Sequence, residues 1–459
     1  MSILNSLEAV EQADHGEPKL KLCILAACPF PANHGTPGSI RELSEAIAER
    51  GHEVHIVTYH IGQDIPLRGV HVHRVKPLFE ESTVTVGPTN RRPVYDLQMV
   101  FEAIKVIRRY KLDMIHAHGY EAALIATLAR VATWKPFIYS AHNSMGDELA
   151  SYDFFRFKWV ANSLAWLLDA VVPRLGNWCI PHSENMKTFL EDRGLGKKCE
   201  PVVNFGIDFE DTPGDGLRFK EQYNLGDSPL IMYTGVMDHF QRLDLLLEAM
   251  VPVTQVVPDA KLILVSTIPN ETHESNLMRK VDELGIRDNV VLTEPLELDD
   301  VREILPLCDV AVVPRPGAPG FPIKLLNYMA AARACVMFES SSSGLTDGEQ
   351  AMLVKPDTSE ALGDTILTLL KDQQLRERIA ANGYRFVRAH HDRSRSAEQV
   401  CKAYIRMLEA KGRWKKIADR PFVGGDATQP VDSKSTATAD QSTENQSSHS
   451  LQGTSTDVK

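Results

Sequence analysis

The chain has 459 residues, which is enough for two domains with complete hydrophobic cores. Its formal net charge of -11 at pH 7 argues against general nucleic-acid binding. Its seven cysteines form no CxxC pair, and this odd, scattered set is typical of reduced thiols in the cytoplasm.

The N-terminal residues 1–18 contain acidic side chains and no apolar run of signal-peptide length. We therefore expect a disordered N-terminus and a cytoplasmic protein. No stretch of the chain approaches the length and apolarity of a transmembrane span.

The first predicted strand–helix–strand unit contains strands at 20–26 and 52–57. Residues 39–42 have the serine–glutamate spacing of a capping box and should begin the helix. Gly35 and Gly38 lie just before it, at the carboxyl edge of the predicted sheet, where glycines let the backbone approach a ligand. The loop is not a GxGxxG sequence, so a dinucleotide fingerprint is absent.

Two further predicted strands carry histidines at or near their ends. Residues 113–119 form a strand in which His116 and His118 share one face, because side chains alternate along a strand. The two are either hydrogen-bonded structural histidines, or His118 contacts a ligand at the mouth of the sheet. The next strand ends at His142 and is followed by Asn143. We expect no metal site, because no third ligand has a helpful spacing.

The longest apolar stretch, residues 159–172, allows two interpretations. One is a core or interface helix. The other is a peripheral membrane contact at the inner face of the membrane, because residues 154–159 and Trp166 mix aromatic with basic side chains, as interfacial helices do.

Strands at 179–184 and 202–208 end this first array, and a turn-rich segment places the domain boundary near residues 206–228. A second array of alternating strands and helices follows. Its strands are predicted at 229–235, 261–265, 290–292, 309–313, 335–338 and 352–354.

The stretch 314–330 is the main candidate for a binding site. Glycine and proline follow a short buried strand, and apolar residues then return at helical spacing. Pro322 suits the first turn of this helix, which places Lys324 in the opening turn. The positive end of a helix disfavours a cation unless an anion lies in front of it, and Arg315 can reach the same anion. The alternative is a solvated lysine on an exposed loop.

The C-terminal part of the second array begins with Ser340–Ser343 and Gly344. These residues form either a flexible loop or a phosphate-binding loop. Two helices are predicted within 359–390, and an amphipathic pattern resumes at 397–408. Residues 421–459 have almost no large apolar side chains, so we expect a disordered tail.

Two successive arrays of this kind predict an α/β protein with two doubly wound, Rossmann-like domains that face each other across a cleft. The expected bounds are 19–206 and 207–396. Ligands then bind between the domains, and closure of the cleft excludes water from the chemistry.

Several segments together identify a family. They are HGTPGSIRELSEAIAERGHEVHIVT, DMIHAHG, HSENMKTFLEDRG, VVNFGID, YTGVMDHFQRLDLLLEAM, GFPIKLLNYMAA and DGEQAMLV. Through them, residues 19–415 resemble the retaining glycosyltransferases of family 4, which have the GT-B fold. In that family a C-terminal helix crosses back to the first domain, and residues 397–415 are the candidate for it.

The resemblance implies a retaining hexosyltransferase that needs no cofactor and no metal ion. It moves a sugar from a UDP- or GDP-linked donor to an alcohol on a glycan or a lipid-linked acceptor. The nucleotide sugar binds mainly to the C-terminal domain and the acceptor to the N-terminal one.

The resemblance also implies roles for individual residues. Arg315 and Lys324 supply positive charge for the donor diphosphate, and His118 orients hydroxyls of the transferred sugar; these three form the catalytic set. The donor-binding positions are Gly35, Gly38, Gly235, Gly320, Phe321, Asn327, Ser343 and Gly344. The acceptor-side positions are His142 and Asn143.

The chain departs from the common family pattern at four donor-site positions. Pro319 and Asn327 replace two glutamates, and Val236 and Gln241 replace an arginine and a lysine. A branch of the family is similar to this chain in these respects. The alternative function is a non-catalytic, sugar-nucleotide-binding relative. An epimerase or a dinucleotide oxidoreductase is a further alternative, which the missing GxGxxG sequence disfavours.

Overall fold

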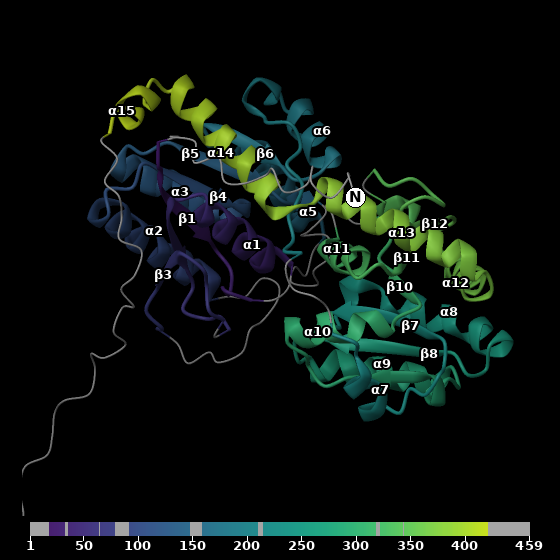
Figure 1. The fold of residues 1–459 in the computed structure, drawn as a ribbon. Coiled ribbons are helices and arrows are strands. Elements are labelled where there is room, and N and C mark those ends of the chain that lie inside the picture. Colours follow the sequence, from purple (N-terminus) through teal and green to yellow (C-terminus); the bar gives the residue numbers. More distant parts are fainter. Residues whose placement is uncertain are drawn as a thin grey trace, which may run out of the picture. The chain divides into compact units, whose positions relative to one another are not determined.

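The computed structural model describes residues 18–32, 35–63, 65–78, 91–146, 158–209, 214–317, 322–342 and 344–420 (Figure 1). Within these ranges the chain forms two parallel sheets with helices packed against them. Residues 1–17 and 421–459, for which disorder is predicted, lie outside the described residues.

The first sheet has six parallel strands in the order β3-β2-β1-β4-β5-β6. Its strands are β1 (Lys21–Ala26), β2 (Glu53–Thr58), β3 (Val70–Arg74), β4 (Met114–His118), β5 (Phe137–Ala141) and β6 (Trp178–Pro181). All but β3 were predicted, with ends shifted by a few residues. Edge strand β3 carries two valines that are only partly buried, so it lacks the continuous apolar run that identifies a buried parallel strand.

The second sheet also has six parallel strands, in the order β12-β11-β10-β7-β8-β9. Its strands are β7 (Leu230–Gly235), β8 (Lys261–Ser266), β9 (Val290–Leu292), β10 (Val310–Val313), β11 (Ala334–Phe338) and β12 (Met352–Val354). All six were predicted from their short apolar runs. The two sheets confirm the predicted doubly wound α/β architecture.

The predicted strand at 202–208 is wrong. This segment forms a single isolated bridge, from Ile207 to Asp392. It passes close to the start of the last long helix, because a Cβ on Gly206 would lie 2.3 Å from the Cα of Arg393. The apolar residues that suggested a strand are Val203, Phe205 and Ile207, which are buried at this crossing instead.

The α-helices cover the faces of both sheets (Figure 1). They are α1 (Gly35–Glu49), α2 (Arg92–Arg109), α3 (Gly119–Thr133), α5 (Lys158–Leu175), α6 (Glu184–Asp192), α7 (Leu217–Gln222), α8 (Leu243–Val256), α9 (Glu271–Glu283), α10 (Leu298–Ile304), α11 (Ile323–Ala330), α12 (Ser359–Lys371), α13 (Gln373–His390), α14 (Arg393–Ala410) and α15 (Trp414–Ala418). Short 3-10 helices are η2 (Gly196–Lys198), η3 (His239–Gln241), η4 (Arg287–Asn289), η5 (Leu305–Leu307) and η6 (Glu339–Ser341). Helix α2 was not predicted from the sequence.

Helix α1 begins earlier than predicted. The capping box at 39–42 is wrong, because Ser39 lies inside the helix and its hydroxyl donates to the carbonyl oxygen of Thr36 at 2.9 Å. Pro37 in the first turn explains the early start, since its fixed φ and missing N–H suit that position.

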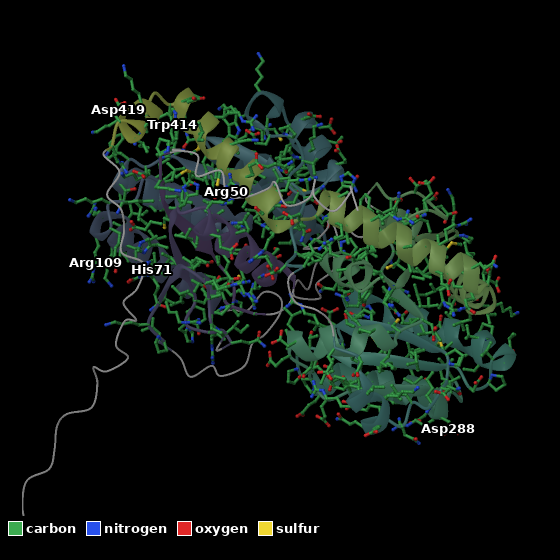
Figure 2. The ribbon with its side chains drawn as sticks, viewed as in Figure 1. Arg50, His71, Arg109, Asp288, Trp414 and Asp419 are labelled. Carbon is green, nitrogen blue, oxygen red and sulfur yellow. The ribbon has the colours of Figure 1, made fainter. Side chains whose placement is uncertain are left out.

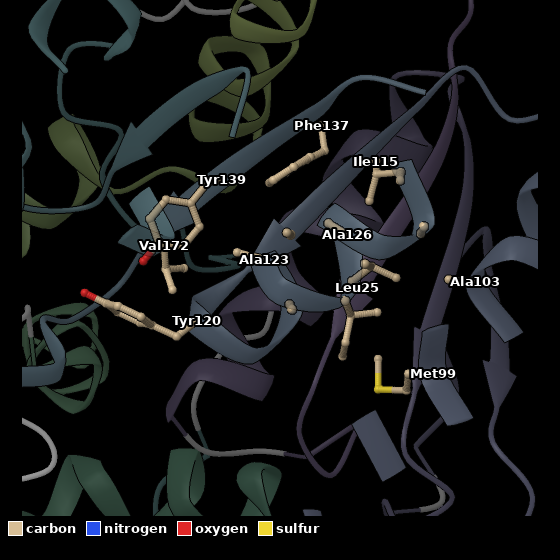
Figure 3. Packing of buried hydrophobic residues seen from close by; sticks show 14 of the residues in the cluster. Leu25, Met99, Ala103, Ile115, Tyr120, Ala123, Ala126, Phe137, Tyr139 and Val172 are labelled. Carbon is tan, nitrogen blue, oxygen red and sulfur yellow. The ribbon is translucent and has the colours of Figure 1, made fainter. Parts of the chain in front are cut away.

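The first sheet is covered on its two faces by different helices. Helices α2, α3 and α5 pack on one face; Figure 3 shows Tyr120, Ala123 and Ala126 of α3 beside Tyr139 of β5 and Val172 of α5. Helices α1 and α14 pack on the other face. Helix α14 therefore completes the core of the first sheet although it lies at the far end of the described chain. The predicted domain bounds stay a prediction.

Buried histidines are a recurring feature of the first sheet and its connections. The buried ones are His52, His55, His116, His118, His142, His182 and His391. Burial lowers the pKa of His182 and of His391 to about 4, from an ordinary value of 6.5. Each of these two rings is held by a hydrogen bond from Nδ1 to a backbone carbonyl oxygen, of Val203 and Phe205 respectively.

We expect the free energy of unfolding to fall as the pH is lowered from about 6.5 to about 4. The unfolded chain binds a proton at each histidine in this range while the folded chain does not, so acid favours unfolding. A full shift from 6.5 to about 4 corresponds to roughly 3 kcal/mol per histidine. Asp96 opposes the trend, because burial raises its pKa to about 6, but the histidines outnumber it. Urea denaturation at a series of pH values measures the effect.

The neighbouring residues His390 and His391 provide a matched control. His391 is buried and His390 is exposed. His391→Gln should reduce the slope of stability against pH, whereas His390→Gln should leave it unchanged. A stability that does not change between pH 7 and pH 5 in the unmodified protein would contradict the prediction.

Candidate functional site

Polar side chains gather at the carboxyl ends of both sheets. His118 ends β4, and His142 and His182 directly follow β5 and β6. In the second sheet Gly235 ends β7, and Arg315 follows β10. Ligands of doubly wound sheets bind at these edges, so each group is a candidate site.

The histidine group at the first sheet is tightly connected. His118 Nδ1 and His142 Nε2 lie 3.1 Å apart, and the rings of His142 and His182 are 4.9 Å apart. Phe205 stacks on both His142 and His182. These contacts hold the rings in fixed orientations.

His116, two residues before His118 on β4, has a structural role. Its Nδ1 lies 2.7 Å from the hydroxyl oxygen of Tyr404 on α14, and its Nε2 lies 2.7 Å from Ser140 Oγ. The same serine oxygen lies 3.1 Å from His182 Nε2. Both ring nitrogens of His116 are thus occupied, and the structural interpretation is confirmed for this histidine.

His118 and His142 each keep one buried ring nitrogen without a hydrogen-bond partner, Nε2 and Nδ1 respectively. Both residues line a pocket together with Leu43 of α1, Phe205 and Arg393. An unpaired buried polar atom is costly, so these nitrogens are suited to a ligand that supplies the missing partners.

The histidines of this pocket are neutral at physiological pH. Burial first, and the neighbouring histidines second, hold the pKa of His118 and of His142 well below the ordinary histidine value. A neutral imidazole can accept or donate one hydrogen bond at each nitrogen but carries no charge. The unpaired ring nitrogens of His118 and His142 therefore suit neutral hydroxyl groups better than anions.

Lys324 is the centre of the second group. Its Nζ donates to the Tyr233 hydroxyl at 2.6 Å and to Gln241 Oε1 at 3.0 Å. It also lies 3.8 Å from the centroid of the Tyr233 ring. A Cβ at Gly235, where φ is +135°, would lie 2.9 Å from Lys324 Nζ, so only glycine leaves room for this side chain.

Arg315 lies beside Lys324. Its guanidinium carbon is 4.5 Å from the centroid of the Phe240 ring, and its Nε is buried without a hydrogen-bond partner. Ser341 Oγ donates to the Arg315 carbonyl oxygen at 2.5 Å, and Ser340 Oγ accepts from the Gly317 N–H at 2.7 Å. These two serines hold the loop that carries Arg315, so their hydroxyls have a structural role.

The two cations share little compensating charge. Burial first, and Arg315 second, hold the pKa of Lys324 well below the ordinary lysine value. Burial also lowers the pKa of Arg315 to about 10. Asp238 is the acid that acts on both, but burial raises its own pKa. The solvated-lysine alternative is therefore wrong, and the group is suited to binding an anion.

The remaining predicted donor positions fall in different places. Gly35, with φ +46° and open space around it, begins α1, and Gly38 lies in the same turn. Helix α1 contacts α11, which carries Lys324 and, one turn later, Asn327. Gly344 has φ +91° and open space beside it. Gly320, Phe321 and Ser343 lie outside the described residues.

On the acceptor side, His142 lines the histidine pocket and the adjacent Asn143 is partly buried. The structure thus joins His118 with His142, and Lys324 with Arg315, at the edges of two different sheets. The roles of all these residues stay predictions.

Sequence reasoning missed several residues of the two groups. Tyr233 belongs to the buried strand β7, and nothing in the sequence indicates that its hydroxyl reaches Lys324. Asp238, Phe240 and Arg393 were not identified either. The polar loop between Gly235 and α8 is the one signal that points to Asp238 and Phe240.

Among the residues that the structure describes, no three histidine, cysteine, aspartate or glutamate side chains form a group that can hold a metal ion. No helix in the same ranges is long and apolar enough to cross a membrane.

Sequence profiles of known families match both halves of the chain. Residues 35–211 match the family described as "Glycosyltransferase Family 4", and residues 228–372 match "Glycosyl transferases group 1".

Individual relatives span most of the chain. The N-acetyl-alpha-D-glucosaminyl L-malate synthase of Bacillus anthracis is 25% identical over 370 residues, which are 78% of this chain and 89% of the relative. The phosphatidyl-myo-inositol mannosyltransferase of Mycobacterium tuberculosis is 24% identical over 394 residues, which are 82% of this chain and 95% of the relative.

Solved structures share the fold. HepE of Anabaena in complex with UDP-glucose superposes with a TM-score of 0.64 at 16% identity, over 84% of this chain and 99% of that one. The sucrose-phosphate synthase of Thermosynechococcus elongatus superposes with a TM-score of 0.73 at 17% identity, over 85% of this chain and 100% of that one. The chain therefore belongs to the glycosyltransferases of family 4 and has their GT-B fold.

Proposed function

We propose that this glycosyltransferase moves a hexose from a UDP- or GDP-linked donor to a hydroxyl group of a glycan or lipid-linked acceptor, with retention of the anomeric configuration. The observation that carries the proposal is the pair of buried cations, Lys324 and Arg315, at the carboxyl edge of the second sheet. A nucleotide diphosphate is an anion of the right chemistry to compensate both.

The names of similar proteins support both donor bases and a lipid-linked acceptor. HepE of Anabaena was crystallised with UDP-glucose. A relative from Mycolicibacterium smegmatis is named as a GDP-mannose-dependent phosphatidylinositol monomannoside mannosyltransferase; it is 26% identical over 39% of this chain and 48% of its own length.

In the proposed reaction the bond between the anomeric carbon and the diphosphate oxygen breaks, and its electron pair stays on the diphosphate. The acceptor oxygen forms the new bond on the same face of the sugar, and its proton passes to the departing phosphate oxygen. The diphosphate gains negative charge as the bond lengthens. Lys324 and Arg315 stabilise that charge, and no metal ion is needed for this role.

The histidine pocket supplies orientation in this proposal. His118 Nε2 is buried and unpaired, so it hydrogen-bonds a hydroxyl of the transferred sugar. His142 and Asn143 contact the acceptor. Because both histidines are neutral, they fix positions without adding charge beside an oxocarbenium-like transition state.

A non-catalytic relative is the second candidate, because Pro319 and Asn327 stand at the positions of the family's two glutamates. Asn327 can still hydrogen-bond a ribose hydroxyl, more weakly than a carboxylate. A nucleotide-sugar-binding protein without turnover would show binding but neither transfer nor hydrolysis.

Lys324→Ala should lower donor turnover about 100- to 1,000-fold, because it removes preorganised positive charge from the departing diphosphate. Lys355 is a matched control, because its side chain is 75% exposed and paired with Glu339 in the same half of the chain. Lys355→Ala should keep full activity. Both variants should unfold at the temperature of the unmodified protein to within a few degrees.

The experiment begins with a thermal-shift screen of UDP-, GDP- and ADP-linked sugars. Donors that stabilise the protein are then used in turnover assays, and nuclear magnetic resonance identifies the anomeric configuration of the product. Inversion of configuration would overturn the retaining mechanism. Full turnover in Lys324→Ala would overturn the assignment of the diphosphate site.

Donor binding should take up protons from solution. The diphosphate favours the charged form of Lys324 and so raises its pKa from the depressed value of the free protein. The complex then binds more protons than the separated partners, and uptake grows as the pH rises toward the pKa of the bound state. Calorimetric titration in buffers of different ionisation enthalpy measures this number.

Lys324→Met is the control for the proton uptake, because its side chain has a similar length and does not titrate. It should abolish the dependence of the binding enthalpy on the buffer. A binding enthalpy that is independent of the buffer in the unmodified protein would show that Lys324 is already fully charged before the donor binds.

A further inference from the structure

The outer surface of three neighbouring helices, α2, α3 and α5, is apolar. Helix α3 contacts α2 on one side and α5 on the other. Of the 16 large hydrophobic side chains that are exposed among the described residues, 12 lie on these helices or at the end of α3. They are Val94, Leu97, Phe101, Leu124, Leu128, Val131, Trp134, Trp159, Leu164, Trp166, Leu167 and Val171. We call this surface the α2–α3–α5 face.

Helix α3 shows how unusual the face is. Its inner side is buried through residues such as Ala122, Ala126 and Ala129. Its outer side presents Leu124 and Leu128, which are one turn apart, where a helix on the surface of a soluble domain carries polar side chains. Such a helix is apolar on both sides although only one side is packed. The outer side is therefore available to a second apolar phase.

Helix α5 has the same construction. The sequence left its role open between a core helix and a membrane contact. In the structure the small side chains of Ala161 and Ala165 point inward and are buried, while Trp159 and Trp166 are 69% and 71% exposed. Residues 154–157, which suggested a membrane contact in the sequence, lie outside the described residues.

The charges on the face have one sign. The exposed charged side chains within 91–146 and 159–175 are Arg91, Lys105, Arg108, Arg109, Lys111 and Arg174. The acids of the same ranges are partly or fully buried, and Glu102 pairs with Lys105. Arg108 donates to the carbonyl oxygen of Ala132, which places a guanidinium at the end of α3, and Arg109 is the last residue of α2 (Figure 2). The chain as a whole has a net charge of -11, so this face is basic on an acidic protein.

This combination identifies one occupant. Exposed tryptophans beside arginine and lysine are typical of surfaces that lie in the headgroup region of a bilayer, where the indole ring is partly apolar and its N–H stays hydrated. Trp134, at 79% exposure, is the most exposed of the three indoles on the face. A second copy of the chain would instead bring the same basic side chains together across a twofold axis.

We propose that the α2–α3–α5 face binds the surface of an anionic lipid bilayer as a peripheral contact. Its apolar side chains enter the headgroup region, and its arginines and lysines contact the acidic lipid headgroups. The proposal goes beyond the glycosyl transfer described above and does not depend on it, because its test measures binding without turnover.

Flotation of the full chain with vesicles tests the proposal. Vesicles of phosphatidylcholine and phosphatidylglycerol in equal amounts should carry the protein upward at low salt, and pure phosphatidylcholine vesicles should carry much less. Tryptophan emission should shift to shorter wavelength on binding, and brominated acyl chains should quench it. Binding that is equal on neutral and acidic vesicles, or no binding to either, would overturn the proposal.

Two pairs of variants locate the contact. Trp134→Gln with Trp166→Gln should abolish flotation, and the control Leu217→Gln with Val256→Gln changes two exposed apolar residues in the other half of the chain. Arg108→Glu with Arg109→Glu should weaken binding by at least about 30-fold, because each basic residue near an acidic surface contributes about fivefold. Its control is Lys197→Glu with Lys198→Glu, an adjacent exposed pair outside the face.

Sedimentation equilibrium without lipid separates the other occupants. A monomer that binds acidic vesicles supports the proposal. A stable dimer that the Trp134→Gln and Trp166→Gln variant dissociates would assign the face to a second copy and overturn the membrane contact. Flotation that is unchanged in all variants of the α2–α3–α5 face would also overturn the membrane contact.

Discussion

Lys324 keeps its side-chain nitrogen out of water, with a tyrosine hydroxyl, a glutamine oxygen and one weakly acidic carboxyl group to compensate its charged form. Burial of a cation is unfavourable unless charge and hydrogen bonds return what hydration provided. The surroundings of Lys324 are arranged to permit it: Gly235 leaves the space, and Tyr233 offers both its ring and its hydroxyl. The free protein thus holds a site that is incomplete without an anion.

The two sheets carry different kinds of binding group. Neutral, hydrogen-bonding histidines lie at the edge of the first sheet, and buried cations lie at the edge of the second. A nucleotide sugar contains both kinds of partner, hydroxyl groups on the sugar and negative charge on the diphosphate. Helix α1, which begins at Gly35 beside the first sheet, contacts α11, which carries Lys324.

How far the sequence predicted this structure depends on the range of the interactions involved. Buried parallel strands read as continuous apolar runs, so nearly all strands were found, whereas edge strand β3 has no such run. Lys324 was identified because a cation is unfavourable in the opening turn of a helix, and Arg315 because it follows the preceding strand and can reach the same anion. Tyr233 was missed because its bond to Lys324 joins residues 91 positions apart. Val203 and Ile207 suggested a strand that does not form, because Val203 is buried in the core that contains α14 and Ile207 in a core of the second sheet.

The return of α14 to the first sheet has a consequence for synthesis of the protein on the ribosome. Residues Ala397–Leu408 fill one face of a sheet whose first strand begins at Lys21, and Tyr404 completes the hydrogen bonding of a histidine in its middle. The half of the molecule that is translated first therefore lacks part of its own interior until the last long helix has emerged. During that interval the second sheet, whose residues form their own cores, can already be assembled.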